Sequence, residues 1–117
     1  MIATIAVAGV AVLHIIFLIL EMFLWTKPSG RRIFGTTREF ARQTAVLAAN
    51  QGLYNGFLAA GLVWGLISGQ QSSQISVFFL ACVIVAGVYG GLTVKPAIFV
   101  VQALPGIIAL LLVLQSG

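Results

Sequence analysis

Four long apolar stretches, separated by clusters of polar and helix-breaking residues, dominate the chain. The first stretch begins at Ile2 and contains only three polar residues, Thr4, His14 and Glu21, before Trp25. About 20 mostly apolar residues are enough for a helix to cross the hydrocarbon core of a bilayer. We therefore expect an all-α protein whose helices cover about residues 2–25, 37–68, 75–92 and 96–114.

Composition supports a membrane location for the whole chain. Of the 117 residues, 61% are hydrophobic and 7% are charged, and the mean hydropathy is +1.15. A soluble domain typically has about a quarter of its residues charged. The length suits one domain, so residues 1–117 are expected to form a single transmembrane domain, an integral membrane four-helix bundle. The first stretch lacks a preceding basic region and is too long for a signal peptide, so we expect it to stay in the mature protein.

Charge is distributed unevenly between the connections. All six basic residues fall in the first and third connections, whereas the middle connection from Gly69 to Ser73 carries no charge. Cytoplasmic loops are enriched in Lys and Arg, so we expect both termini on the outer side and the basic loops in the cytoplasm. Subunits that insert in a single orientation can form only parallel dimers. The basic residues are Lys27, Arg31, Arg32, Arg38, Arg42 and Lys95.

Polar side chains gather in the cytoplasmic half of the predicted spans. At 1.5 Å of rise per residue, Glu21 lies about 6 Å inward from Trp25, and His14 about 16 Å. An ionisable group at membrane depth is costly and normally faces a protein interior, which makes Glu21 and His14 the candidate acid–base groups. The expected ligand pocket comprises Glu21, His14, Asn50, Gln51, Tyr54, Asn55, Gln102 and Tyr89.

The second predicted helix separates polar residues from glycines. At 100° per residue, the positions from Asn50 to Asn55 that carry polar groups fall within an arc of about 140°, which we expect to face the pocket. Gly52 and Gly56 lie outside this arc and form a GxxxG pair. Such pairs let membrane helices approach closely and are compatible with a parallel homo-oligomer through the glycine-rich faces. The same spacing recurs at Gly61 and Gly65, and at Gly87 and Gly91.

The first connection has predicted structure of its own. Thr36-Thr37-Arg38-Glu39 matches a capping box, in which Thr36 caps the second helix and Glu39 reaches back to the N–H of the cap. Glu39 is therefore expected to be structural rather than catalytic. Ile33, Phe34 and Phe40 are expected at the lipid interface, with the arginines near anionic head groups.

Several kinds of site are not expected. The chain has no Asp, which excludes a Ser-His-Asp arrangement, and His14 with Glu21 gives too few ligands for a catalytic zinc, so no metal or cofactor is expected. The formal charge of +4 does not indicate a nucleic-acid partner, because no basic patch is interleaved with aromatic residues. Cys82 is expected to be a packing residue. Pro105 removes a hydrogen bond to the carbonyl of Val101 and should kink the helix beside Gln102.

A pattern spread over nearly the whole chain resembles the small bacterial membrane proteins catalogued as domain of unknown function 1304. The resemblance implies four spans and a multi-pass protein of the bacterial plasma or inner membrane, and it implies no activity. The chain has Ile16 where the family has an aromatic residue, so no role that needs a ring there is carried over. The pattern consists of His14, Glu21-Met22-Phe23, Asn50-Gln51-Gly52-Leu53-Tyr54-Asn55-Gly56 and Gln102-Ala103-Leu104-Pro105.

Three classes of function fit these residues. The first is a binder or carrier of a small lipid-soluble molecule, with a pocket that opens to the cytoplasmic side. The second is an integral-membrane enzyme that uses Glu21 and His14 as acid–base groups on a lipophilic substrate. The third is a non-catalytic membrane subunit whose polar residues fix the register of its helices. The sequence favours them in this order and identifies neither the ligand nor a reaction.

Overall fold

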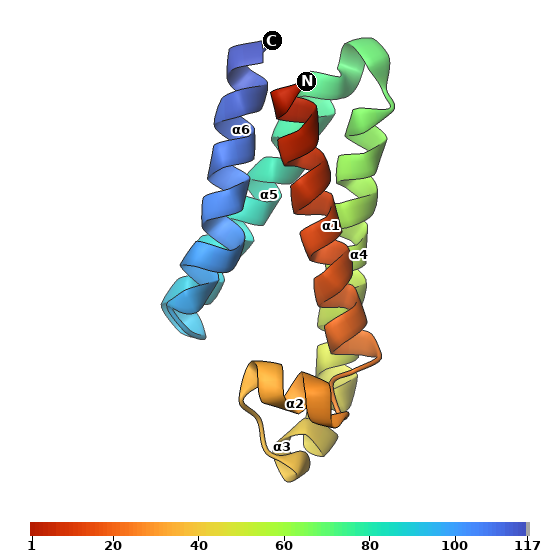
Figure 1. Cartoon of the computed structure of the whole chain (residues 1–117), viewed down its shortest axis with the longest axis vertical. Coiled ribbons are helices and arrows are strands. Elements are labelled where there is room, and N and C mark those ends of the chain that lie inside the picture. Colours follow the sequence, from red (N-terminus) through yellow and green to blue (C-terminus); the bar gives the residue numbers. More distant parts are fainter. Residues whose placement is uncertain (117) are drawn as a thin grey trace. The chain divides into compact units, whose positions relative to one another are not determined.

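The computed structural model describes residues 1–116, and all regular elements within that range are helical (Figure 1). The all-α prediction is therefore confirmed. Four helices are long and two are short, with a 3₁₀ turn and a π-helical segment beside them. The elements are α1 (Ile2–Met22), α2 (Pro28–Phe34), α3 (Arg38–Gln43), α4 (Ala45–Leu66), η1 (Gly69–Gln71), α5 (Ser72–Thr93), η2 (Phe99–Ala103) and α6 (Leu104–Ser116).

Three of the long helical segments are long and apolar enough to cross a membrane. Helix α4 has 22 residues but is not among them, because its polar residues, from Asn50 to Asn55, lower its hydropathy. The membrane character of the chain is thus supported, and the fourth span stays a prediction. The three segments are Ile2–Met22, Gly69–Thr93 and Phe99–Ser116.

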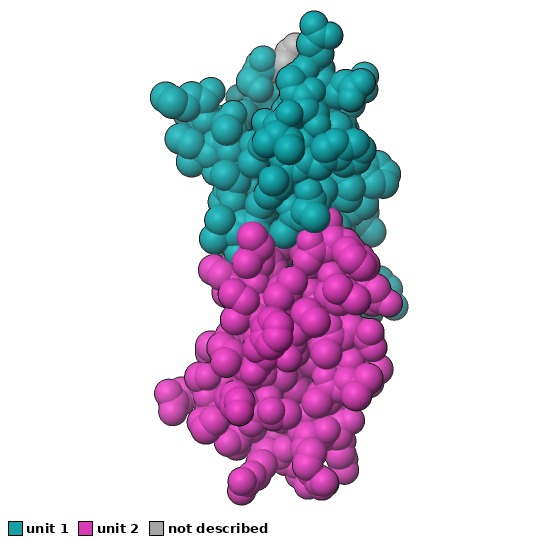
Figure 2. Space-filling model, turned by 90° about the vertical axis from the view of Figure 1, so that its right-hand side faces the viewer, with its two compact units in different colours: residues 1–12, 58–117 teal, residues 13–57 magenta. Residues whose placement is uncertain are grey.

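The chain separates into two compact units (Figure 2). The first unit comprises residues 1–12 and the described residues from 58 onward, and the second comprises Leu13–Phe57. The division falls within α1, between Val12 and Leu13, and within α4, between Phe57 and Leu58.

The first unit has a core to which α1, α4, α5 and α6 all contribute. Leu62 of α4 and Leu80 of α5 are fully buried in it. Figure 1 shows both chain ends and η1 at one end of this unit, and the α5–α6 connection at the other. The core residues are Val7, Val10, Ala11, Leu62, Leu80, Val83, Ala109 and Val113.

The glycine pairs make close contacts within the chain. A Cβ on Gly87 would lie 2.6 Å from the backbone nitrogen of Ala103, and one on Gly61 would lie 2.3 Å from the ring of Phe79. The glycine-rich faces assigned above to a homo-oligomer are therefore covered by the chain's own helices, and we do not propose an oligomer through them. The remaining contacts are Gly52 with Met22, Gly56 with Leu18, Gly65 with Ser76, and Gly91 with Phe99.

Several helix bounds differ from the expected ones. The first helix ends at Met22, and α2 forms where a connection was expected. The helix expected over 37–68 is divided at Thr44, whose φ of −106° and ψ of 7° end α3. Before α6, Leu104 donates its N–H to the carbonyl of Phe99, which closes a π turn. Pro105 has no N–H, so the regular ladder cannot continue through it, and the distortion expected there takes the form of this π segment.

The second unit is held together around Trp25. Its indole Nε1 donates to Thr44 Oγ1 at 3.0 Å, and its ring lies 4.9 Å from that of Phe34. Gly30 is buried, and a Cβ there would lie 1.9 Å from the carbonyl oxygen of Leu24. Helix α2 therefore crosses the end of the α1 segment so closely that only glycine fits at its third residue.

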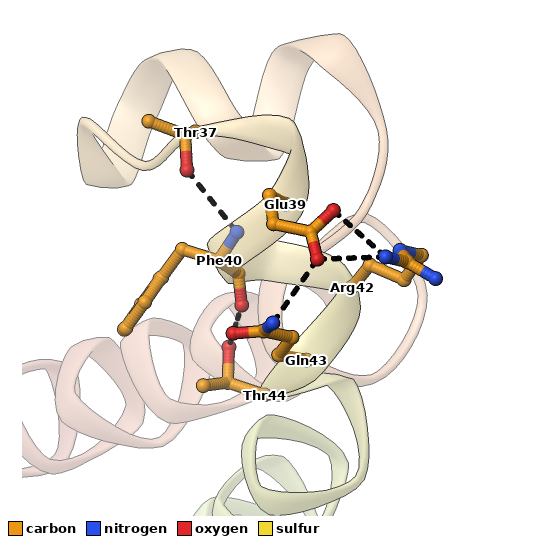
Figure 3. Close-up of polar contacts among 6 residues, drawn as sticks. All are labelled: Thr37, Glu39, Phe40, Arg42, Gln43 and Thr44. Atoms are coloured by element: carbon orange, nitrogen blue, oxygen red, sulfur yellow. Dashed lines mark hydrogen bonds and ion pairs between the residues drawn. The ribbon is translucent and has the colours of Figure 1, made fainter.

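The predicted capping box is wrong by one position. Thr37 is the cap of α3, and its Oγ1 accepts from the N–H of Phe40 at 3.1 Å (Figure 3). Phe40 then occupies the position from which a Glu would reach back, so the reciprocal bond cannot form. Glu39 instead accepts bonds from Arg42 at 2.7 Å and Gln43 at 3.0 Å (Figure 3). The structural role expected for Glu39 is met through different partners.

Candidate functional site

Glu21 and Asn55 form the polar contact between α1 and α4 in the second unit. Asn55 Nδ2 donates to Glu21 Oε1 at 2.6 Å, and Asn55 is only 5% exposed. No donor among residues 1–116 bonds the second carboxylate oxygen of Glu21. The pair thus leaves one oxygen of a partly buried carboxyl group available for another hydrogen bond.

Gly52 makes this contact geometrically feasible. A Cβ on Gly52 would lie 2.7 Å from Met22 Cγ and 3.1 Å from Glu21 Cβ, so α4 approaches α1 along a face with no side chain. Asn55 follows by three residues and therefore lies on nearly the same face. The close approach brings its amide to the carboxylate.

The glycine contacts also fix the register of α1 against α4. Gly52 is level with Met22, and Gly56 is level with Leu18. Residues of α4 before Gly52, including Asn50 and Gln51, are therefore level with the end of α1 or beyond it.

His14 is completely buried, with its ring 5.3 Å from that of Phe17 in an edge-on arrangement at 70°. It precedes Glu21 by two helical turns, which separates the two positions by about 10 Å along the axis. This distance is too long for a direct hydrogen bond. His14 and Glu21 would therefore act as two separate acid–base groups, and this role stays a prediction.

The expected polar arc of α4 divides into a buried edge and an exposed part. Asn50, Gln51 and Tyr54 are exposed, and Asn50 Nδ2 donates to the carbonyl of Val46 on its own helix at 3.2 Å. Only Asn55, at the edge of the arc, is buried. The small residues of α4 set the face that packs on α1, so the bulkier polar side chains are turned away from it.

Gln102 and Tyr89 belong to the first unit. Gln102 is half-buried on the π segment, and Tyr89 is 69% exposed on α5. Within the second unit the structure brings Glu21 together with Asn55. The full set of eight pocket residues stays a prediction.

Sequence reasoning missed two features. Thr44 joins the α3–α4 break to Trp25, a contact that no pattern in the sequence marked. An apolar groove of about 290 Å³ also lies between α1 and α6, where Gly9 and Pro105 leave space. Its lining residues are Ala6, Gly9, Val10, Leu104, Pro105 and Ile108.

Among residues 1–116, no three His, Cys, Asp or Glu side chains are grouped so that they could hold a metal ion. At Glu21 the described site offers hydrogen bonding and proton exchange at one carboxyl group. An amide fixes one of its oxygens.

Comparisons with known proteins agree with the resemblance seen in the sequence. The family model described as "Protein of unknown function (DUF1304)" matches residues 8–114. The uncharacterized protein YpaA of Lactococcus lactis subsp. lactis (strain IL1403) is similar, with 30% identity over 94 residues, 79% of each chain. No solved structure matches the chain.

Proposed function

The chain belongs to the DUF1304 family, and we propose that it is a multi-pass bacterial membrane protein that binds a small lipophilic molecule at Glu21 and Asn55. The family description supplies no activity, so the proposal rests on the chain's own residues. The observation that carries it is the 2.6 Å bond between these two side chains where α4 packs on α1.

A carboxyl group in such a helix is costly for the fold. Ionisable residues within membrane segments cost about 2.5–3.5 kcal/mol even on the milder insertion scales, and they usually mark a functional site. A purely structural contact to Asn55 would need only a neutral amide, because Gln presents the same acceptor oxygen. The carboxyl group itself is therefore best explained by a ligand or a proton.

The free oxygen of Glu21 defines the chemistry of the ligand. A carboxylate accepts hydrogen bonds, so the ligand should carry a hydroxyl, amide or amine donor on an apolar body. Gln51 and Tyr54 on the exposed part of α4 would line the approach from the cytoplasmic side. Glu21 can release a proton to cytoplasmic water as a ligand binds and take one up again as the ligand leaves, which is the exchange that a proton-coupled carrier uses.

The proposed topology has four spans with both termini on the outer side of the plasma membrane. An even number of spans places both chain ends on the same side of the membrane. In the first unit both chain ends and the uncharged η1 connection lie at one end, and the Lys95 connection lies at the other (Figure 1). Helix α4 would cross the membrane in addition to the three apolar segments. The approach of α1 to its small-residue face supports this proposal, because α1 shields Asn55 from lipid.

The test is extraction of protein purified in mild detergent, followed by mass spectrometry of the organic phase. We expect one apolar molecule with a hydrogen-bond donor, near one copy per chain. A profile that only reproduces the bulk lipids of the membrane would contradict the proposal. Incubation of the loaded protein then separates the classes, since an unchanged molecule indicates a binder or carrier and a converted one indicates an enzyme.

A further inference from the structure

The connection between α1 and α4 has an excess of positive charge. It holds five of the six basic residues and one acid, Glu39. Glu39 lies 2.7 Å from Arg42, so this pair is neutral as a unit (Figure 3). No other salt bridge is present among residues 1–116. The four remaining cations are thus uncompensated, and they are Lys27, Arg31, Arg32 and Arg38.

Large apolar side chains are exposed beside these charges. Ile33 is 60% exposed on α2, Phe40 is 50% exposed on α3, and Phe23 is 63% exposed just after α1. Figure 3 shows Phe40 and Arg42 extending to opposite sides of α3. Helices with a basic face and an apolar face are typical of segments that lie in the plane of a membrane interface.

This segment is held in place rather than loosely attached. The Trp25–Thr44 bond and the close crossing at Gly30 fix it to the ends of the long helices, and Ala41 is fully buried. Arg31 Nε and Thr36 Oγ1 are buried and have no hydrogen-bond partner in the described part of the chain.

We propose that α2 and α3 form a docking surface for anionic phospholipids. Arg31, Arg32 and Arg38 contact head-group phosphates, while Ile33 and Phe40 enter the acyl boundary. Arg side chains match phosphate oxygens with paired N–H donors. The apolar side chains favour a lipid over nucleic acid or an acidic protein, neither of which would cover them. The inference rests on the proposed membrane topology and is independent of a ligand at Glu21.

The test uses the full chain in uncharged detergent, with Trp64→Phe so that Trp25 fluorescence reports on this surface. The protein is titrated with short-chain phosphatidylglycerol and, in separate experiments, with phosphatidylcholine, inorganic phosphate and a single-stranded oligonucleotide. Each basic residue near an anionic surface contributes about fivefold in affinity. Arg31→Gln with Arg32→Gln should thus weaken phosphatidylglycerol binding about 25-fold. Ile33→Ser with Phe40→Ser should weaken phosphatidylglycerol binding and leave any oligonucleotide binding unchanged.

The matched control is Glu39→Gln with Arg42→Gln, which removes two charges without changing the net charge and should shift the affinity by less than about twofold. If the double arginine variant fails to fold, the single variant Arg38→Gln should still show about a fivefold loss. Three results would overturn the proposal: equal affinity for the two lipids, inorganic phosphate binding as tightly as phosphatidylglycerol, or the oligonucleotide binding more tightly than phosphatidylglycerol. Unchanged binding in the folded arginine variants would do the same.

Discussion

Asn55 donates a 2.6 Å hydrogen bond to Glu21, which lies 34 residues earlier in the chain. The contact exists because Gly52, three residues before Asn55, lets α4 approach α1 without a side chain between them. The close packing of α4 on α1 and the hydrogen bond therefore depend on the same face of α4. A substitution that disturbs the packing should also weaken the hydrogen bond, and the reverse should hold.

The Glu21–Asn55 pair should respond differently to loss of charge and loss of the acceptor. In Glu21→Gln the amide oxygen can still accept from Asn55, so the free energy of unfolding in detergent should change by less than about 1 kcal/mol. In Glu21→Leu the amide of Asn55 loses its partner while buried, which should cost about 1–3 kcal/mol.

A double-mutant cycle with Asn55→Leu isolates this coupling. Once Asn55 is absent, Glu21→Leu should cost less than it does in the native chain, because no buried amide is left unpaired. Equal costs in both backgrounds would show that the bond does not stabilise the protein.

Gly30 should be far less tolerant of alanine than Gly9. A Cβ on Gly30 would overlap the backbone of Leu24, whereas one on Gly9 would meet nothing within 4 Å. We expect Gly30→Ala to destabilise the protein by more than about 1 kcal/mol, as overpacking against fixed atoms does. Gly9→Ala, within α1, should be neutral or stabilising by up to about 1 kcal/mol. Thermal midpoints of the two variants in the same detergent make the comparison, and similar midpoints would refute the close crossing of α2.

Thr37, rather than Thr36, should act as the cap of α3. Its hydroxyl accepts from the N–H of Phe40, so Thr37→Ala should cost about 1 kcal/mol. Thr36→Ala removes a hydroxyl that has no partner among the described residues and should be nearly silent. Thermal denaturation or local hydrogen exchange at Phe40 distinguishes the two, and a larger effect at Thr36 would restore the capping box expected from sequence.

The long helices were predictable because their signal is simple. Apolar runs of spanning length, broken by Gly, Pro and charged residues, located α1 and α5 to within three residues. The helix expected over 37–68 is divided at Thr44, and the one expected over 96–114 is divided into η2 and α6. The π segment before Pro105 was not predictable in detail. The missing N–H is evident in the sequence, but whether a helix kinks or changes register there depends on its neighbours, such as Gly87 against Ala103.

The site was predictable in its residue types and less so in its geometry. An acidic residue in an apolar run marks Glu21, and the angular pattern of α4 marks its polar residues. The pattern could not show that α1 packs on the glycine side, which buries Asn55 and leaves Asn50 exposed. That choice depends on how closely two backbones can approach, which is a property of the pair of helices.

Orientation in the membrane can be tested by cysteine labelling in sealed cells. In a Cys82→Ser background, Gln71→Cys in the uncharged connection should react with an impermeant maleimide from outside. Arg31→Cys should react only after the cells are opened, because the basic connection is expected in the cytoplasm. Equal labelling of both positions from both faces would contradict the single orientation and the parallel arrangement of any dimer.

The most direct test of the central claim compares the two glutamates of the chain. The apolar molecule that co-purifies with the protein is quantified in the wild type, Glu21→Gln and Glu39→Gln, alongside the thermal midpoint of each. Glu39 is exposed and paired with Arg42, so Glu39→Gln is the matched control. We predict that Glu39→Gln retains the molecule and that Glu21→Gln loses it with its fold intact. Full retention by a folded Glu21→Gln variant would contradict a ligand site at Glu21.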